Sequence, residues 1–254
     1  MTTYRLGKTP ARIGATHLRM MSYLDSTVLP KIPANVGHDA IVPSWAGCLG
    51  NDVAGDCVWA GAAHETILWA AEAAKHVPFS DASVLSDYSA LTGYDPNDPS
   101  TDQGTDMQQA ASYRLKTGVI DATGTRHKIG AYLAVTPGNP DELAAAIYIF
   151  GAVGIGLRFP SYAMDEFNEG KPWDTRLGPM QIDGGHYVCA TARRNGVFDV
   201  VTWGRIQKMT ERFYRRFNDE TLVYLSPEFL TAGKSPEGFD LARLQADLKA
   251  FVRA

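Results

Sequence analysis

The sequence predicts an α+β fold in which a helical part is followed by a β-rich part. The helical part is indicated by the Ala-rich run 58–75, for which Asp56 is a candidate N-cap. The β-rich part is indicated by two apolar segments, 187–193 and 197–203, separated by Asn195-Gly196. Because Asn-Gly favours the tight turn of a hairpin, these segments are expected to pair as antiparallel strands.

Two more helices are predicted by their N-terminal signals. Thr105 and Gln108 have the spacing of a capping box, for a helix that ends before Gly118. Asn139 and Pro140 supply the N-cap and the first-turn proline of the next helix. Both helices are expected between the Ala-rich helix and the hairpin.

A cysteine at the start of the first helix points to a thiol nucleophile. The thiolate is the reactive form, and a helix N-terminus or a nearby imidazolium stabilises it, so Cys57 stands at a favourable position. Asn51, six residues earlier, can donate a hydrogen bond to an oxyanion. His186, which opens the first hairpin strand, is the candidate base.

This arrangement resembles the papain-like cysteine peptidases. Residues 51–59 resemble the segment Gln-Gly-x-Cys-Gly-Ser-Cys-Trp-Ala of that family, with Cys57 as nucleophile and Asn51 in place of the oxyanion-hole glutamine. His186 lies about 130 residues after Cys57, as in papain-like enzymes. Residues 201–204, Val-Thr-Trp-Gly, align with the family's Asn-Ser-Trp-Gly. The resemblance implies a two-lobed fold, with a helical lobe that carries the nucleophile and an antiparallel sheet or barrel lobe that carries the histidine.

The resemblance also implies residues that bind substrate. Gln103 and Gly104 correspond to the family's Gly-Gly segment, which lines the substrate cleft. Gly185, directly before the candidate base, is placed with them. Trp203 corresponds to the tryptophan that shields the histidine from water in the family.

Three positions depart from the family pattern. Val201 replaces the asparagine that orients the histidine, and Asp199, on the same strand face as Val201, is the best local substitute. Thr202 is a weaker candidate, because alternation places it on the other face. Asp56 stands beside the nucleophile, where a carboxylate disfavours the thiolate unless it caps the helix. Ala54 replaces a disulfide cysteine of the family motif.

Two functions therefore remain open. In the first, the chain is a thiol hydrolase, a cysteine peptidase or amidase, that uses Cys57 and His186. In the second, it is a catalytically inactive papain-like protein with a binding or structural role, for instance in a phage virion. An open groove at Cys57 would favour the enzyme, and a groove filled by the N-terminal arm would favour the alternative.

Composition bounds the remaining properties. The 254 residues are 45% hydrophobic and 20% charged, which suits one domain with a substantial core. A net charge of −4 gives no reason to expect nucleic acid as a partner. No apolar run has the length of a bilayer span and the N-terminus lacks a signal peptide, so we expect no membrane partner and a cytoplasmic location, or a virion if the chain is phage-encoded.

Neither a cofactor nor a metal is expected. The three cysteines show no Cys-x-x-Cys spacing and are expected to be reduced. An acidic stretch is better explained by loop capping than by calcium, and its residues are Asp95, Asp98, Asp102 and Asp106.

The chain divides into three expected parts. Residues 1–44 form an extended arm, residues 45–226 the papain-like domain, and residues 227–254 a helical extension. The extension is amphipathic, with Leu241, Leu244, Leu248 and Phe251 on one face. Expected partners are a peptide or amide substrate, or a protein that contacts the arm or the terminal helix.

Overall fold

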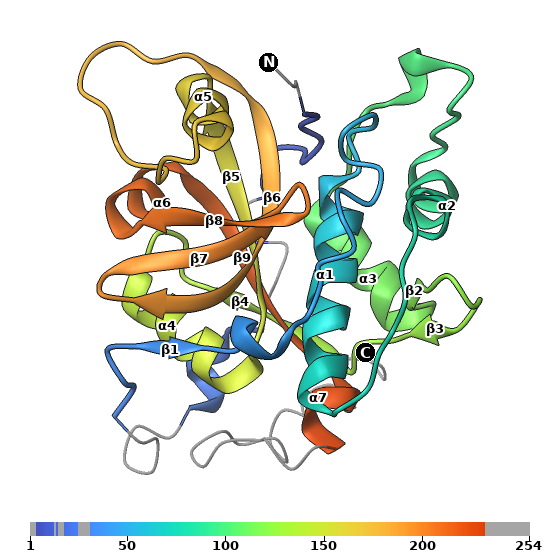
Figure 1. Ribbon diagram of the computed structural model, residues 1–254, viewed down its shortest axis with the longest axis horizontal. Coiled ribbons are helices and arrows are strands. Elements are labelled where there is room, and N and C mark those ends of the chain that lie inside the picture. Colours follow the sequence, from blue (N-terminus) through green and yellow to red (C-terminus); the bar gives the residue numbers. More distant parts are fainter. Residues whose placement is uncertain (1–3, 13, 15–17, 25–30, 232–254) are drawn as a thin grey trace.

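The computed structural model describes residues 4–12, 14, 18–24 and 31–231. Helices α1, α2, α3 and α7 gather on one side of the molecule, and the antiparallel sheet lies on the other side together with α4, α5 and α6 (Figure 1). The two-lobed α+β fold expected from the sequence is therefore confirmed. The predicted terminal helix, with Leu241, Leu244, Leu248 and Phe251, lies outside the described residues.

The helical lobe is built around α1 (Cys57–Glu72). Its Ala-rich sequence favours helix, and it is buried along nearly its whole length. It ends three residues earlier than the sequence suggests, because the backbone leaves the helix at Ala73 and Ala74 adopts a positive φ of 54°. Two helices accompany it, α2 (Asp81–Thr92) and α3 (Met107–Lys116).

The cap of α3 corrects one expectation. Asp106, not Thr105, is the N-cap, and its carboxylate accepts hydrogen bonds from the N–H groups of Gln108 and Gln109, both at 2.9 Å. The Thr105 hydroxyl instead accepts from the indole N–H of Trp59, at 3.1 Å. A carboxylate one residue closer to the helix reaches two free N–H groups, and the hydroxyl then ties α3 to α1.

The sheet lobe contains a seven-stranded antiparallel sheet with the order β4-β9-β5-β6-β7-β8, and β1 adds to β6. The predicted hairpin is confirmed between β6 (Ile182–Arg194) and β7 (Val197–Thr202). Asn195 and Gly196 adopt φ angles of 52° and 75°, as a type I′ turn requires. The other strands are β1 (Val36–Gly37), β4 (Ala131–Val135), β5 (Val153–Pro160), β8 (Arg205–Thr210) and β9 (Asn218–Leu225).

The predicted N-cap Asn139 begins α4 (Pro140–Phe150) and accepts from the N–H groups of Asp141 and Glu142, which confirms that assignment. This helix and α1 cover opposite faces of the sheet, so the apolar core forms two layers.

The remaining described elements are η1 (Met20–Tyr23), η2 (Asp39–Ile41), η3 (Pro99–Thr101), β2 (Val119–Ile120), β3 (Arg126–His127), α5 (Tyr162–Asn168), α6 (Glu211–Phe217) and α7 (Pro227–Thr231). No helix in these residues is both long and apolar enough to cross a bilayer.

The two lobes are joined by close contact between α1 and β6. Gly61 lies against the ring of Tyr187, and a Cβ at that glycine would fall 2.3 Å from the ring. One turn later, buried Glu65 forms an ion pair of 2.7 Å with Arg114 of α3 and accepts the Tyr187 hydroxyl hydrogen bond. The Arg114 guanidinium lies 4.1 Å from the centroid of Tyr224 on β9. This buried cluster connects four elements, α1, α3, β6 and β9.

Replacing Arg114 by Met is expected to lower the free energy of unfolding by roughly 3–5 kcal/mol, since Glu65 is left buried without its charge partner. Urea denaturation measures the loss. The double variant Glu65→Met/Arg114→Met, which removes both charges, should recover much of it. Equal losses in the single and double variants would show that the ion pair does not govern this interface.

Candidate active site

Cys57 is the first residue of α1 and lies at the junction of the two lobes, with 1% of its surface exposed. Asp56 occupies the N-cap position, where its backbone carbonyl accepts from Trp59 and Ala60. Its carboxylate makes no capping bond and has no well-formed hydrogen bond in the described residues. Burial raises the pKa of Asp56 well above the carboxyl range, and the nearby Asn51 amide lowers it in part.

The environment of Cys57 favours the neutral thiol. Burial raises its pKa to about 12, and the charge of Asp56 adds to this effect. The backbone N–H groups of Tyr187 and Gly7 and the charge of Lys8 act in the opposite direction. The Tyr187 contact also places the sulfur beside β6, next in sequence to His186.

His186 is fully buried and held on two sides. Its Nε2 lies 2.7 Å from the Thr202 hydroxyl, and its ring stacks on Trp203 with centroids 4.3 Å apart. Its Nδ1 has no hydrogen-bond partner within the described part of the chain. Burial lowers the pKa of His186 to about 3, so the imidazole is neutral near pH 7. With Nε2–H donated to the hydroxyl, Nδ1 carries the lone pair of a base.

The expectation that Asp199 orients His186 is wrong. The Asp199 carboxylate binds Arg194 and Lys208, the latter at 2.6 Å, and the histidine is bonded by Thr202 instead. The strand register explains the error. Val201 pairs with Cys189, an odd number of residues from His186, so Val201 faces α1 while the histidine occupies the other face of β6. Thr202 follows Val201 and therefore shares the face of the histidine.

The loop before Cys57 is fixed by two side chains. The Asn51 amide donates to the carbonyl of Ala54 at 3.0 Å, so one of its two hydrogens holds the loop. Asp102 accepts from the Gly55 N–H at 3.0 Å and from the Tyr88 hydroxyl at 2.5 Å. The sequence placed Asp102 in an acidic stretch without a role at this site, and only the long-range contact with Gly55 reveals one.

The cleft at Cys57 contains the chain's own N-terminal arm, defined here as residues 4–12. Figure 1 shows this segment between β6 and the N-terminal end of α1. The N–H groups of Gly7 and Lys8 both donate to Gly185 O, at 3.1 and 3.0 Å. On the opposite wall, Thr105 N–H donates to Gly7 O at 2.6 Å, and Thr9 N–H donates to Thr105 O at 3.0 Å. The arm is thus hydrogen-bonded to both lobes.

Glycines allow this close approach. A Cβ at Gly7 would lie 1.7 Å from the carbonyl oxygen of Gly55. A Cβ at Gly104 would lie 2.3 Å from Gly7 O, and one at Gly185 would lie 2.1 Å from Lys8 O. Since real Cβ atoms do not approach so closely, only glycine fits at these crossings.

The candidate substrate-binding residues surround the same cleft. Gln103, Gly104 and Gly185 line it together with the arm. Trp203 lies deeper, and Tyr4 of the arm stacks on it with centroids 5.0 Å apart. The Trp203 indole nitrogen is buried and has no hydrogen-bond partner among the described residues. The arm thus lies against Gly104 and Gly185, stacks on Trp203 through Tyr4, and brings the Gly7 N–H to the Cys57 sulfur.

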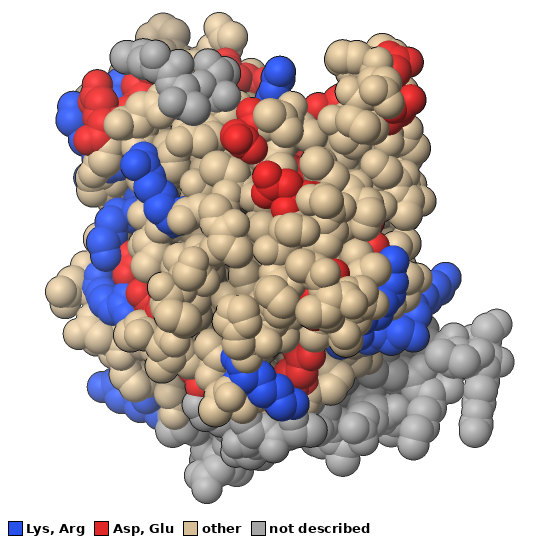
Figure 2. Space-filling model, turned by 45° about the vertical axis from the view of Figure 1, so that its right-hand side comes forward, with Lys and Arg blue, Asp and Glu red and all other residues tan. Residues whose placement is uncertain are grey.

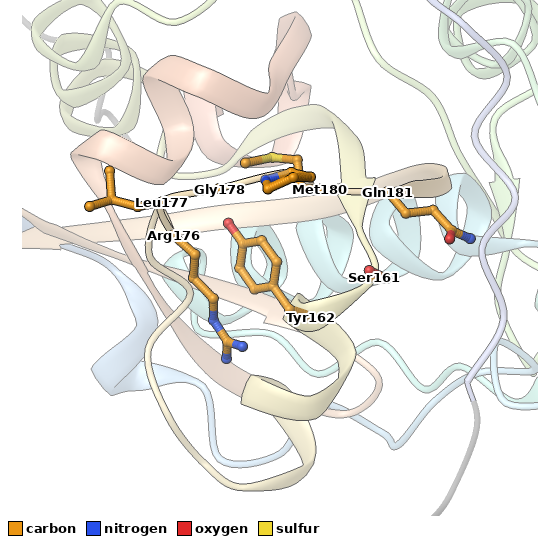
Figure 3. Close-up of a pocket in the computed structure, with 8 residues that line it drawn as sticks. Ser161, Tyr162, Arg176, Leu177, Gly178, Met180 and Gln181 are labelled. Carbon is orange, nitrogen blue, oxygen red and sulfur yellow. The ribbon is translucent and has the colours of Figure 1, made fainter.

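Two other surface features lie apart from this site. Asp95 and Asp98 are exposed in the loop between α2 and α3, and Figure 2 shows acidic side chains at the upper tip of the molecule. Asp95 accepts a hydrogen bond from the Asn97 N–H, and Asp98 accepts one from the Ser100 N–H. A pocket of about 590 Å³ between the start of α5 and loop 176–181 is shown in Figure 3. Neither feature contains a candidate catalytic residue.

Comparisons with known proteins identify the fold. No protein-family model matches the sequence, and no curated protein matches it. Among solved structures, xylellain, a cysteine protease from Xylella fastidiosa, matches 89% of this chain and 98% of its own, with a TM-score of 0.63 and 12% identity. Procathepsin B from Trypanosoma congolense covers 86% of each chain, with a TM-score of 0.60 and 14% identity.

A third solved structure agrees. Digestive procathepsin L 3 of Tenebrio molitor matches 84% of this chain and 75% of its own, with a TM-score of 0.59 and 17% identity. At these identities the likeness establishes the fold alone. The chain has the papain-like fold.

In the native protein, alkylation of Cys57 by iodoacetamide at pH 8 is expected to be at least ~100-fold slower than in the urea-unfolded chain, because the thiol is buried and protonated. The rate should still rise between pH 8 and pH 10, since the thiol pKa is about 12. Peptide mapping measures it, with half-buried Cys48 as the internal reference. A rate that levels off below pH 8 would contradict this assignment.

Proposed function

We propose that this chain, which has the papain-like fold, is a thiol hydrolase held in a closed state by its N-terminal arm. One observation carries the proposal. His186 is held by Thr202 and Trp203 with Nδ1 unpaired, and the residue after it contacts the sulfur of Cys57. We infer that the unpaired Nδ1 serves as the base for this thiol, since thiol catalysis requires a base that is held through its other nitrogen.

The proposed reaction is the hydrolysis of an amide. The Cys57 sulfur, after proton transfer to His186, attacks the carbonyl carbon, and the oxyanion receives a hydrogen bond from the N-terminus of α1. Asn51 is the proposed second donor, once its amide turns from Asp56 to the oxyanion. The C–N bond then breaks as His186 returns the proton to the leaving amine. Water attacks the thioester, with His186 as base, and releases the acid and the free thiol.

The closed state explains why Cys57 and His186 are both neutral near pH 7. Both pKa shifts have burial as their first cause, and Gly7 and Lys8 of the arm lie close enough to Cys57 to affect its pKa. Departure of the arm would admit water, move the pKa of Cys57 down and that of His186 up, and favour the charged pair. We therefore expect activity to depend on the position of the arm.

A catalytically inactive binding or structural protein is the second candidate. The occupied cleft is the observation that favours it, together with the unsatisfied carboxylate of Asp56 beside Cys57. In that case, the arm would be a permanent part of the fold, and displacing it would create no reactive thiol.

The substitution Gly7→Val separates these candidates. A side chain at residue 7 cannot fit against Gly55 O, so the arm should leave the cleft while Cys57 and His186 remain unchanged. We expect alkylation of Cys57 to accelerate by roughly 100-fold and hydrolysis of a mixed pool of peptide amides to become measurable by mass spectrometry.

Matched variants identify the groups responsible. Gly7→Val/Cys57→Ala should hydrolyse nothing, and Gly7→Val/His186→Ala should lose the fast alkylation. Gly130→Val is the control for adding valine at a glycine, because Gly130 is exposed, has no positive φ, and its added Cβ meets only Leu225 O at 3.6 Å. Slow alkylation of Cys57 in a folded, arm-released variant would favour the inactive candidate.

A further inference from the structure

Asp56 carries a buried carboxyl group without the partners that an ionised carboxylate needs. The residue has no exposed surface, and neither carboxyl oxygen has a well-formed hydrogen bond among the described residues. A Cβ at Gly50 would fall 2.9 Å from Asp56 Oδ2 and 2.9 Å from Leu85 Cγ, so the loop and α2 close around this group. Burying an unpaired charge in such a place costs far more than burying a neutral acid.

A second aspartate at a helix N-cap shows the contrasting arrangement. Asp106 accepts hydrogen bonds from the N–H groups of Gln108 and Gln109 and from two nitrogens of Arg12. Burial raises the pKa of Asp106, but these bonds outweigh burial and lower it overall. Asp56 makes no capping bond and no ion pair within the described part of the chain, so it lacks everything that keeps Asp106 ionised.

The charges around Asp56 also disfavour its ionised form. Burial is the main cause that raises the pKa of Asp56, the Asn51 amide lowers it in part, and the charges of Asp102 and Asp81 raise it further. The charge of Asp56 adds to burial in raising the pKa values of four other groups, which are Cys48, Cys57, Tyr88 and Tyr94. None of these groups is a cation that could neutralise the carboxylate.

The protonation state of Asp56 matters most for Cys57, the next residue. Burial raises the pKa of the Cys57 thiol, and a charge on Asp56 raises it again. Because like charges interact strongly where water is excluded, the thiolate forms more readily while Asp56 keeps its proton. A neutral Asp56 is therefore compatible with a nucleophilic thiolate beside it.

Asn51 links Asp56 to the oxyanion of the proposed reaction. Its amide favours the ionised form of Asp56, since it donates toward the carboxyl group. When Asn51 turns to an oxyanion, Asp56 loses this donor and keeps its proton more firmly. The linkage is reciprocal, because a neutral acid holds the amide less strongly than a carboxylate, whose hydrogen bonds are roughly twice as strong.

We propose that Asp56 is a positioning residue that works as a neutral carboxylic acid, so that no charge opposes the Cys57 thiolate and the Asn51 amide can turn to the oxyanion. This inference rests on the proposed function for the statement that the thiolate attacks a substrate. The protonation state itself is a property of the folded chain and is tested without a substrate.

Unfolding as a function of pH tests the protonation state. In the unfolded chain an aspartate loses its proton at about pH 4, whereas Asp56 keeps its proton in the folded protein, so its contribution to stability falls as the pH rises. In urea titrations, the unfolding constant of the unsubstituted protein divided by that of Asp56→Asn should rise about tenfold per pH unit from pH 5 to pH 7. All other titrating groups are present in both proteins and cancel in the ratio.

Two further variants support this measurement. Asp56→Ser, with the residue that precedes the cysteine in the papain-like segment, should give the same slope and provides the test if Asp56→Asn does not fold. Asp106→Asn is the matched control. Since the pKa of Asp106 is lowered in the folded protein, both states are ionised above pH 5 and its ratio should be constant. A constant ratio for the folded Asp56 variants would overturn the inference.

The pH profile of Cys57 alkylation tests the effect on the thiol in the arm-released state. Iodoacetamide labelling of Gly7→Val and of Gly7→Val/Asp56→Asn should have the same pH midpoint within about half a unit, because a neutral acid and its amide act alike on the thiol. An ionised Asp56 would place the midpoint of Gly7→Val at least about one unit higher than that of the double variant. That result would also overturn the inference.

The outcomes separate this inference from the proposed function. A rising unfolding ratio with slow alkylation of folded Gly7→Val would count against the hydrolase and leave the neutral acid standing. Fast alkylation with a constant unfolding ratio would leave the hydrolase standing and remove the neutral acid.

Discussion

The contact between α1 and β6 is the constraint on which the site depends. Gly61 lets the helix lie directly on the Tyr187 ring, and the buried pair of Glu65 and Arg114 fixes the helix along its axis. Cys57, one turn before Gly61, is therefore brought beside the residue that follows His186. Two chain segments that are distant in sequence are held side by side because the close packing of this helix on this strand prevents them from sliding past each other.

Local signals in the sequence were sufficient for the elements and insufficient for the contacts between them. The Asn195-Gly196 turn and the Asn139 cap depend on neighbouring residues only, and both appear as predicted. The partner of His186 depends on strand register, where a shift of one residue exchanges the two faces, and so Thr202 was ranked below Asp199. The pairing of Lys8 with Asp219 joins opposite ends of the chain and leaves no local signal.

The arm and burial together determine the state of Cys57 and His186. Gly7 and Lys8 of the arm lie beside the Cys57 sulfur, and both the sulfur and the imidazole are buried, which disfavours their charged forms. In the proposed hydrolase, departure of the arm and charging of the pair would be one equilibrium, so the rate of thiolate alkylation would report how often the arm departs. The aromatic stack of Tyr4, Trp203 and His186 extends this coupling to the far end of the arm.

The backbone pairing of the arm has a further consequence for any competitor. Gly7 O is held by Thr105 N–H at 2.6 Å, so this carbonyl is turned to the cleft wall as a hydrogen-bond acceptor. Because the arm is tethered, its effective concentration at the cleft is in the range of ~mM for a short flexible connection and does not change when the protein is diluted. A peptide that binds from solution must therefore exceed this local concentration, or make better contacts than the arm, before it gains access to Cys57.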